Sequence, residues 1–146
     1  MKKFELTSEF VTFLGKKLFR IKALVSFGDV KEGELGGLVE KEENLDQSGN
    51  AWVSGDARVY GEAWVSGDAR VQNCRDYSAT SCFGSGNRTT TFFRTKDGGI
   101  SVRCGCFYGT LAEFREKVKE RHGGRRLAKE YLMLADLMEF RLSKDE

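Results

Sequence analysis

Residues 50–73 repeat one six-residue phrase four times, as NAWVSG, DARVYG, EAWVSG and DARVQN. Alanine takes the second place of every copy and valine the fourth, and glycine closes each of the first three copies. A repeat this short cannot bury an apolar face by itself, so each copy must stack on another. The stacking of short units therefore constrains this chain more than any other feature of its sequence.

Inside each copy, alanine and valine lie two residues apart, which places both side chains on one side of an extended segment. The opposite side carries Trp52, Arg58, Trp64 and Arg70. The glycines permit a positive φ at a corner between extended segments. A meander of hairpins with turns at Gly61 and Gly67 is the alternative, but arms of about four residues make poor hairpins.

The pattern Ala-x-Val-x-Gly followed by Asp, Glu or Asn resembles the hexapeptide repeat of left-handed parallel β-helices, in which three copies form a coil of about 18 residues. The resemblance implies that residues 18 apart stack on one another. The expected pairs are Arg70 with Trp52 (cation–π), Arg58 with Glu40 (an ion pair) and Val71 with Val53 (in the interior).

The N-terminal part is predicted to form a β-hairpin over residues 4–27, with a turn at Gly15 and Lys16, that caps the stacked repeats. Residues 28–49 form an acidic block, in which seven carboxylates against two lysines give a net charge of −5. The run GELGGLVEKEENLDQSGNAWVSG at residues 33–55 resembles the start of small phage and prophage proteins with this repeat. Such proteins are often labelled acyltransferase-like or cytoskeletal-polymer-like.

The C-terminal part is predicted to begin after residue 73, with strands at 77–83, 88–95 and 100–104 separated by glycine-rich turns. A capping box from Thr110 to Glu113 opens a helix that ends at about His122, and a second helix with one apolar stripe covers residues 126–142. CGCFYGTLAEF and KVKERHG resemble the tail of the same phage proteins.

The expected fold is mainly β with an α+β C-terminus. A hairpin cap and a short left-handed parallel β-helix occupy residues 1–73, and a three-stranded antiparallel sheet with two helices occupies residues 74–146. The chain has 146 residues, no proline and no apolar run of membrane-spanning length, and MKKFELTSEF lacks a signal-peptide core. We expect a cytoplasmic protein, in the host cell if a phage encodes it, with its four cysteines as thiols or ligands.

The sequence offers few residues suited to catalysis. Enzymes on the resembled scaffold rely on histidines in or between coils, whereas this chain has one histidine, His122, outside the repeats. We expect no catalytic residue and no cofactor. Cys82, Cys104, Cys106 and His122 are weak metal candidates, but Cys-x-Cys lacks the spacing of paired Cys-x-x-Cys ligands, and the alternative is a small cysteine core.

Two stretches are candidates for binding. Hydroxyls, amides and a guanidinium in the turn at residues 84–91, and the start of the helix at Thr110, suit phosphate. The candidate ligand-binding residues are Ser85, Asn87, Arg88, Thr89, Thr91, Arg94 and Thr110. A plain hairpin turn is the alternative.

Residues 115–129 carry seven basic and two acidic side chains, a net charge of +5. The candidate partner-binding residues are Arg115, Lys119, Arg121, Arg125, Arg126, Trp52 and Trp64. A nucleic acid or an acidic protein would suit this surface, and a solvated helical face is the alternative.

Together these features predict a non-catalytic phage-type binding protein, acting in counter-defence by sequestering or blocking a host immune protein, a guide complex or a nucleotide signal. A dimer or trimer is expected. The alternatives are a hexapeptide-repeat acyltransferase-like enzyme dependent on His122 and a structural, virion-associated oligomer.

Overall fold

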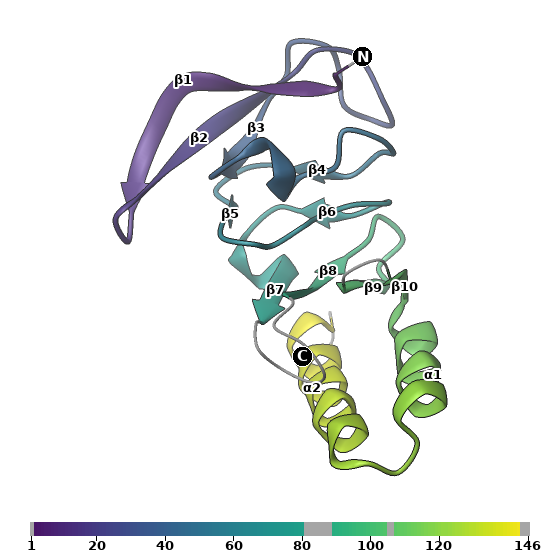
Figure 1. Cartoon of the computed structure of the whole chain (residues 1–146). Coiled ribbons are helices and arrows are strands. Elements are labelled where there is room, and N and C mark those ends of the chain that lie inside the picture. The colour runs from purple at the N-terminus through teal and green to yellow at the C-terminus, as the bar shows by residue number, and fades with distance from the viewer. Residues whose placement is uncertain (1, 81–88, 105–106, 144–146) are drawn as a thin grey trace.

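The computed structural model describes residues 2–80, 89–104 and 107–143. Figure 1 shows an elongated molecule with the N-terminal hairpin at one end, short strands next, then a second sheet, and two helices at the other end. The strands in the first half are β1 (Phe4–Phe13), β2 (Lys16–Ala23), β3 (Leu35–Val39), β4 (Trp52–Val53), β5 (Arg58–Val59) and β6 (Arg70–Val71). The second half contains β7 (Tyr77–Thr80), β8 (Thr90–Arg94), β9 (Ile100–Cys104), β10 (Phe107–Thr110), α1 (Leu111–His122) and α2 (Arg126–Leu142).

The described strands form three sheets, in the orders β1-β2-β3-β5, β4-β6 and β10-β9-β8-β7. The N-terminal hairpin is confirmed, since β1 and β2 pair antiparallel from Phe4 opposite Ala23 to Phe13 opposite Lys16. It does not lie on the repeats as a separate cap. Instead β2 pairs antiparallel with β3, and β3 pairs parallel with β5 from the repeats.

The predicted left-handed parallel β-helix is wrong. The two-residue strands of the repeats belong to two different sheets, β5 to a mixed sheet with β1, β2 and β3, and β4 and β6 to a separate two-stranded sheet. Together with the two helices, these sheets make a mixed α+β arrangement rather than one continuous coil. The spacing of partners explains this: Leu38 lies opposite Arg58, 20 residues on, whereas Trp52 lies opposite Arg70, 18 residues on. Leu45 also lies opposite Val65, 20 residues on, so two additional residues between Leu45 and Trp52 break the constant period that the resemblance requires.

The pairing of individual repeat segments was predicted correctly, although the continuous coil was not. Val53 opposite Val71 and Trp52 opposite Arg70 are confirmed as parallel pairs, so these segments are not arms of a hairpin meander. Gly36 allows β3 to approach them closely, because a Cβ there would lie 2.6 Å from the carbonyl oxygen of Val53.

The side-chain contacts expected across these pairs are wrong. The Arg70 guanidinium binds Asp29 at 2.7 Å, and Trp52 makes an edge contact with Phe27 instead. Because Arg58 pairs in register with Leu38, its guanidinium does not reach Glu40 and lies 4.9 Å from the centre of the Phe13 ring.

The C-terminal sheet has four strands where three were predicted. Residues 107–110 form β10, antiparallel to β9, immediately before α1. The two helices are confirmed at residues 111–122 and 126–142, and the Thr110 capping box is present. The division into domains 1–73 and 74–146 stays a prediction.

Two apolar clusters fill the interior. One gathers the alanines and valines of the repeats with Phe4, Ile21 and Phe93. The other lies between the C-terminal sheet and the helices and contains Phe92, Phe114 and Leu134 among others. Neighbouring residues of β8 thus enter different clusters, because side chains alternate across a strand.

Lys3 ties the start of the chain to the loop that carries the two additional residues. Its ammonium is buried and donates to the carbonyl oxygens of Ser48, Gly49 and Ala51 at 3.4, 3.3 and 2.8 Å, and it lies 4.7 Å from the centre of the Phe27 ring. Burial lowers the pKa of this amine from its ordinary value of 10.5 to about 8.

This shift predicts a pH-dependent stability. Between pH 8 and 10.5 the unfolded chain holds a proton on Lys3 that the folded chain has released, so the free energy of unfolding should rise with pH. The slope should reach at most about 1.4 kcal/mol per pH unit and be missing in Lys3→Met. Urea unfolding of both proteins across this pH range measures the difference, and parallel pH profiles would contradict the assignment.

Candidate functional site

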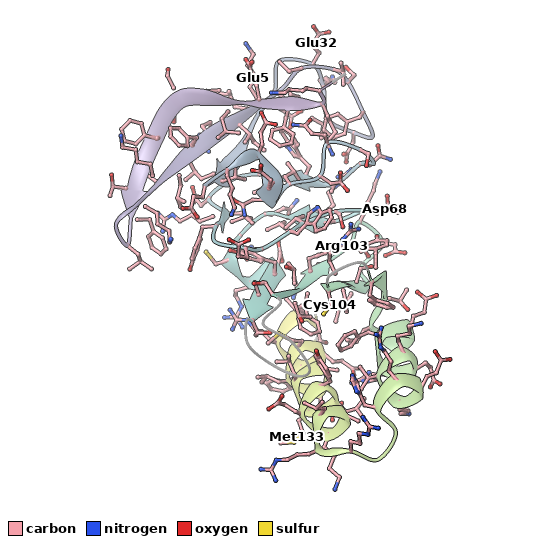
Figure 2. All side chains as sticks on the ribbon, viewed as in Figure 1. Glu5, Glu32, Asp68, Arg103, Cys104 and Met133 are labelled. Carbon is pink, nitrogen blue, oxygen red and sulfur yellow. The ribbon has the colours of Figure 1, made fainter. Side chains whose placement is uncertain are left out.

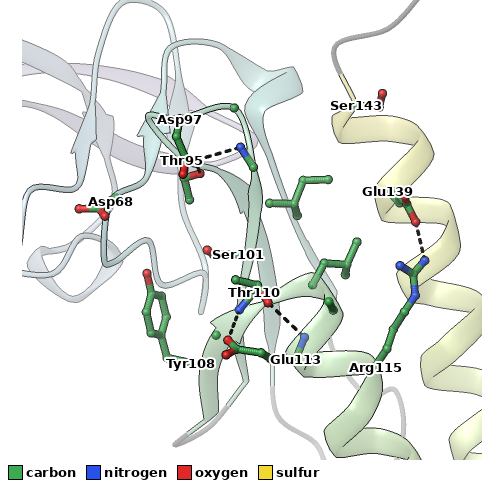
Figure 3. A pocket seen from close by; sticks show the side chains of 16 residues that line it. Asp68, Thr95, Asp97, Ser101, Tyr108, Thr110, Glu113, Arg115, Glu139 and Ser143 are labelled. Atoms are coloured by element: carbon green, nitrogen blue, oxygen red, sulfur yellow. Dashed lines mark hydrogen bonds and ion pairs between the residues drawn. The ribbon is translucent and has the colours of Figure 1, made fainter.

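A hollow of about 810 Å³ opens where the C-terminal sheet meets the repeats and the helices (Figure 3). The last corner of the repeats contributes Asp68, and the β8–β9 turn contributes Thr95 and Asp97. The remaining polar lining comes from β9, β10 and both helices, as Ser101, Tyr108, Thr110, Glu113, Arg115, Glu139 and Ser143. Described polar residues from six different parts of the fold therefore surround one space.

Four carboxylates border this hollow, which we call the acidic hollow: Asp68, Asp97, Glu113 and Glu139. Figure 3 shows Asp68 and Glu139 on opposite sides of it. Asp97 accepts hydrogen bonds from the Thr95 hydroxyl at 2.6 Å and the Gly99 amide at 3.1 Å. These bonds lower the pKa of Asp97, and so it stays ionised at neutral pH.

Glu113 is positioned by the start of α1. Its carboxylate accepts the Thr110 amide at 2.8 Å, and its own amide donates to the Thr110 hydroxyl at 3.1 Å. This reciprocal cap fixes the side chain at the rim, because it satisfies amides that have no partner within the helix.

Arg115 is the single cation among the described residues that line the hollow, and it is already neutralised. Arg115 binds Asp136 and Glu139, each at 2.7 Å, and so joins α1 to α2. The hydrogen bond to Glu139, followed by that to Asp136, raises the pKa of the Arg115 guanidinium. With one guanidinium against four carboxylates, the acidic hollow suits a cationic group and disfavours phosphate.

Tyr108 is the aromatic side chain among the described residues that line the acidic hollow, and it packs against residues behind the lining. Tyr108 stacks on Phe93 with ring centres 6.4 Å apart, and Arg103 lies between Tyr108 and Trp64, 3.5 Å from the centre of the Trp64 ring. Figure 2 shows Arg103 on the same side of the molecule as Asp68. The amide of Trp64 donates to the Thr91 hydroxyl at 3.0 Å, which fastens this corner of the repeats to β8.

The described members of the predicted ligand-binding set do not come together. Ser85, Asn87 and Arg88 lie outside the described residues. Thr91 is buried against Trp64, and Arg94 binds Asp76 at 3.0 Å and the carbonyl oxygens of Leu142 and Ser143 at 2.6 and 3.0 Å. Thr89 lines a separate hollow of about 410 Å³ beside Arg58 and Tyr60, so Thr110 alone borders the acidic hollow.

The predicted partner-binding residues are also dispersed. Arg115 is engaged between the helices, and Lys119 pairs with Glu116 at 3.9 Å. Arg121, Arg125 and Arg126 are exposed around the α1–α2 turn, at the end of the molecule farthest from the hairpin (Figure 1). Trp52 is buried in the repeat cluster, and Trp64 is half-buried beneath Arg103.

Of the cysteine and histidine candidates, the structure describes Cys104 and His122, which have different partners. Cys82 and Cys106 fall outside the described residues, the Thr90 hydroxyl donates to the Cys104 sulfur at 3.2 Å, and His122 stacks on Tyr131. In residues 2–80, 89–104 and 107–143, no group of three or more His, Cys, Asp or Glu side chains is arranged to hold a metal ion.

Sequence reasoning missed the acidic hollow because its carboxylates are scattered from residue 68 to residue 139. Local patterns place Asp97 in a glycine-rich turn and Glu113 in a helix cap, and the structure shows both residues in these positions. Their convergence depends on the unpredicted β10, which sets where α1 begins.

Comparison with known proteins gives no further guide to the site. No protein-family model matches the chain, and a search of curated proteins found no significant match. Among the helices that the structure describes, none combines the length and the apolar character needed to cross a membrane.

The placement of Tyr108 can be tested at two equivalent glycines. Gly61 and Gly67 close successive repeats with φ of +68° and +66°, but a Cβ at Gly67 would overlap the Tyr108 hydroxyl, whereas Gly61 has open space around it. Gly61→Ala should cost about 1–2 kcal/mol from its backbone conformation. Gly67→Ala should cost about 1 kcal/mol more, because Tyr108 must leave Phe93.

Urea unfolding gives the two costs, and the ring signals of Tyr108 in NMR spectra report its displacement. Equal costs with unchanged Tyr108 signals in Gly67→Ala would show that the ring does not depend on this corner.

Proposed function

We propose that this chain is a non-catalytic binding protein whose acidic hollow takes a lysine- or arginine-rich surface of another protein. The observation that carries the proposal is the balance of charge in the hollow, where, among the residues that the structure describes, four carboxylates face a single guanidinium that is already paired. A basic side chain entering there would meet carboxylates on several sides.

The proposed partner is a host immune protein or a guide ribonucleoprotein. Proteins that bind nucleic acid present arginine and lysine side chains to phosphates. A rigid set of carboxylates can occupy such a surface and compete with the nucleic acid. The sequence resemblance to small phage and prophage proteins supports a counter-defence role in the host cytoplasm, and we propose that the protein acts there as a homo-oligomer, a dimer or a trimer.

A nucleotide signal is a less suitable occupant of this hollow because its phosphates would face the carboxylates. The proposed function therefore narrows the sequence-based hypothesis to protein and ribonucleoprotein partners. It requires neither a metal nor a cofactor.

The repeats provide a matched pair of variants for a test of binding. Asp56 and Asp68 open the second and the fourth repeat and both are exposed, but only Asp68 borders the acidic hollow. A short peptide of alternating arginine and glycine should shift the amide NMR signals of Gly98, Gly99 and Gly109. Asp68→Asn should weaken its binding by about fivefold and Asp56→Asn should leave it unchanged, because loss of one nearby charge is worth about 1 kcal/mol.

Added salt should weaken peptide binding to the wild-type protein. A peptide of alternating glutamate and glycine provides the control for non-specific contact. Equal effects of the two substitutions, or shifts confined to the α1–α2 turn, would refute the acidic hollow as the site.

The counter-defence role can be tested with the same variants. Expression of the wild-type protein in bacteria that carry a phage-defence system should raise the number of plaques formed by a sensitive phage. Asp68→Asn should lose most of this protection, whereas Asp56→Asn should retain it at an equal protein level. If the wild-type protein raises the number of plaques with none of a panel of defence systems, the counter-defence role is contradicted. The result of the peptide-binding test would not be affected.

A further inference from the structure

The outer side of α2 carries large apolar side chains that do not enter the core. Met133, Leu137 and Phe140 are 70, 55 and 84% exposed. They are spaced by four and then three residues, which aligns them along one side of a helix. Figure 2 shows Met133 on the side of α2 that points away from α1. We refer to these three residues as the outer stripe.

A separate stripe on α2 makes the core contacts. Tyr131, Leu134, Met138 and Leu142 are buried against the C-terminal sheet and α1. The core stripe and the outer stripe thus occupy different sides of one helix. A surface helix normally needs only one apolar side. A second apolar stripe on an exposed helix indicates a contact with another helix or protein surface.

Two charged residues beside the outer stripe are placed so that they can pair between two copies of the chain. Glu130 and Arg141 lie on the same flank of the stripe, near its two ends. When two copies of a helix pack antiparallel about a twofold axis, the same flanks of both copies face each other. Glu130 of each copy then lies beside Arg141 of the other, which yields two opposite-charge contacts and no like-charge contact between these residues.

The apolar residues fit the same register. In an antiparallel pair, the residue number rises along one helix as it falls along the other, so the numbers of facing residues have a constant sum. If Met133 of one copy faces Leu137 of the other, this sum is 270, and Glu130 of one copy faces Phe140 of the other. Arg141 is one residue beyond Phe140, about 1.5 Å along the axis, so the Glu130 carboxylate can reach it. The Nε of Arg141 already donates to the Ser78 hydroxyl at 2.9 Å, but a guanidinium has further donors for a carboxylate.

From these observations we propose that α2 is a homodimer interface, in which the outer stripes of two copies pack antiparallel with Glu130 beside Arg141 of the second copy. The stripe offers on the order of 400 Å² of apolar surface per copy, below the roughly 800 Å² per partner of a standard interface. A hollow between Arg75, Ser78 and the C-terminal half of α2 borders the stripe and adds contact area for the second copy. A weak, concentration-dependent dimer is therefore expected, and it does not depend on what the acidic hollow binds.

Sedimentation velocity under reducing conditions, over protein concentrations from about 1 to about 300 μM, tests the proposal. The wild-type protein should pass from monomer to dimer in this range. Phe140→Glu and Leu137→Glu should each raise the dissociation constant at least about tenfold. Leu14→Glu is the matched control, because Leu14 is 75% exposed on the β1–β2 turn and should leave the dimer unchanged.

A charge exchange tests the orientation. Glu130→Arg and Arg141→Glu should each raise the dissociation constant by about three- to tenfold, and the double variant should regain most of the wild-type value. Circular dichroism and thermal unfolding show that each variant is folded. A monomer at every concentration, a dimer insensitive to Phe140→Glu, or no recovery in the double variant would overturn the antiparallel α2 interface.

Discussion

The burial of β8 on both faces is the constraint on which the rest of the structure depends. Its first four residues are buried, and their side chains alternate between two environments. Thr91 and Phe93 face the repeats, where Thr91 accepts the Trp64 amide, while Phe92 and Arg94 face the helices, where Arg94 binds the Leu142 carbonyl oxygen. A cation at the C-terminus of α2 also interacts favourably with the helix dipole. One strand therefore fastens the repeats to one face of the sheet and the helix pair to the other.

The acidic hollow is a consequence of this two-sided arrangement. The chain leaves β8 at Thr95, which pairs with Ala69 in the repeats, and the Lys96 amide donates to the Asp68 carbonyl oxygen at 2.9 Å. These backbone contacts hold the corner with Asp68 beside the turn with Asp97. Strand β10 returns along β9 and passes directly into α1, which places Glu113 at the same opening. Rigid backbone connections thus bring carboxylates together although repulsion between like charges opposes their convergence.

The sequence predicted local structure well where one short pattern determines it. The hairpin, both helices and the Thr110 cap follow from periodicity and turn chemistry. The pairing of Val53 with Val71 follows from the resemblance to the hexapeptide repeat. The continuous β-helix failed because it requires a constant period, and two additional residues before Trp52 are enough to divide the repeats between sheets. The site was not predictable in the same way: Thr91 and Arg94 have the chemistry to bind phosphate, but burial of β8 commits them to the interior. Long-range packing, which no local pattern encodes, decided both outcomes.

The two proposed surfaces lie on different sides of α2. Glu139 borders the acidic hollow, whereas Leu137 belongs to the outer stripe, and residues two apart on a helix differ by about 200° around its axis. Pairing through the outer stripe would therefore leave open the part of both acidic hollows that holds Asp68, Asp97 and Glu113. A dimer with two hollows could engage two basic segments of one partner, or two copies of a symmetric partner. The second contact would then form at a high effective concentration, so that hollows of modest individual affinity could retain a large basic protein or ribonucleoprotein.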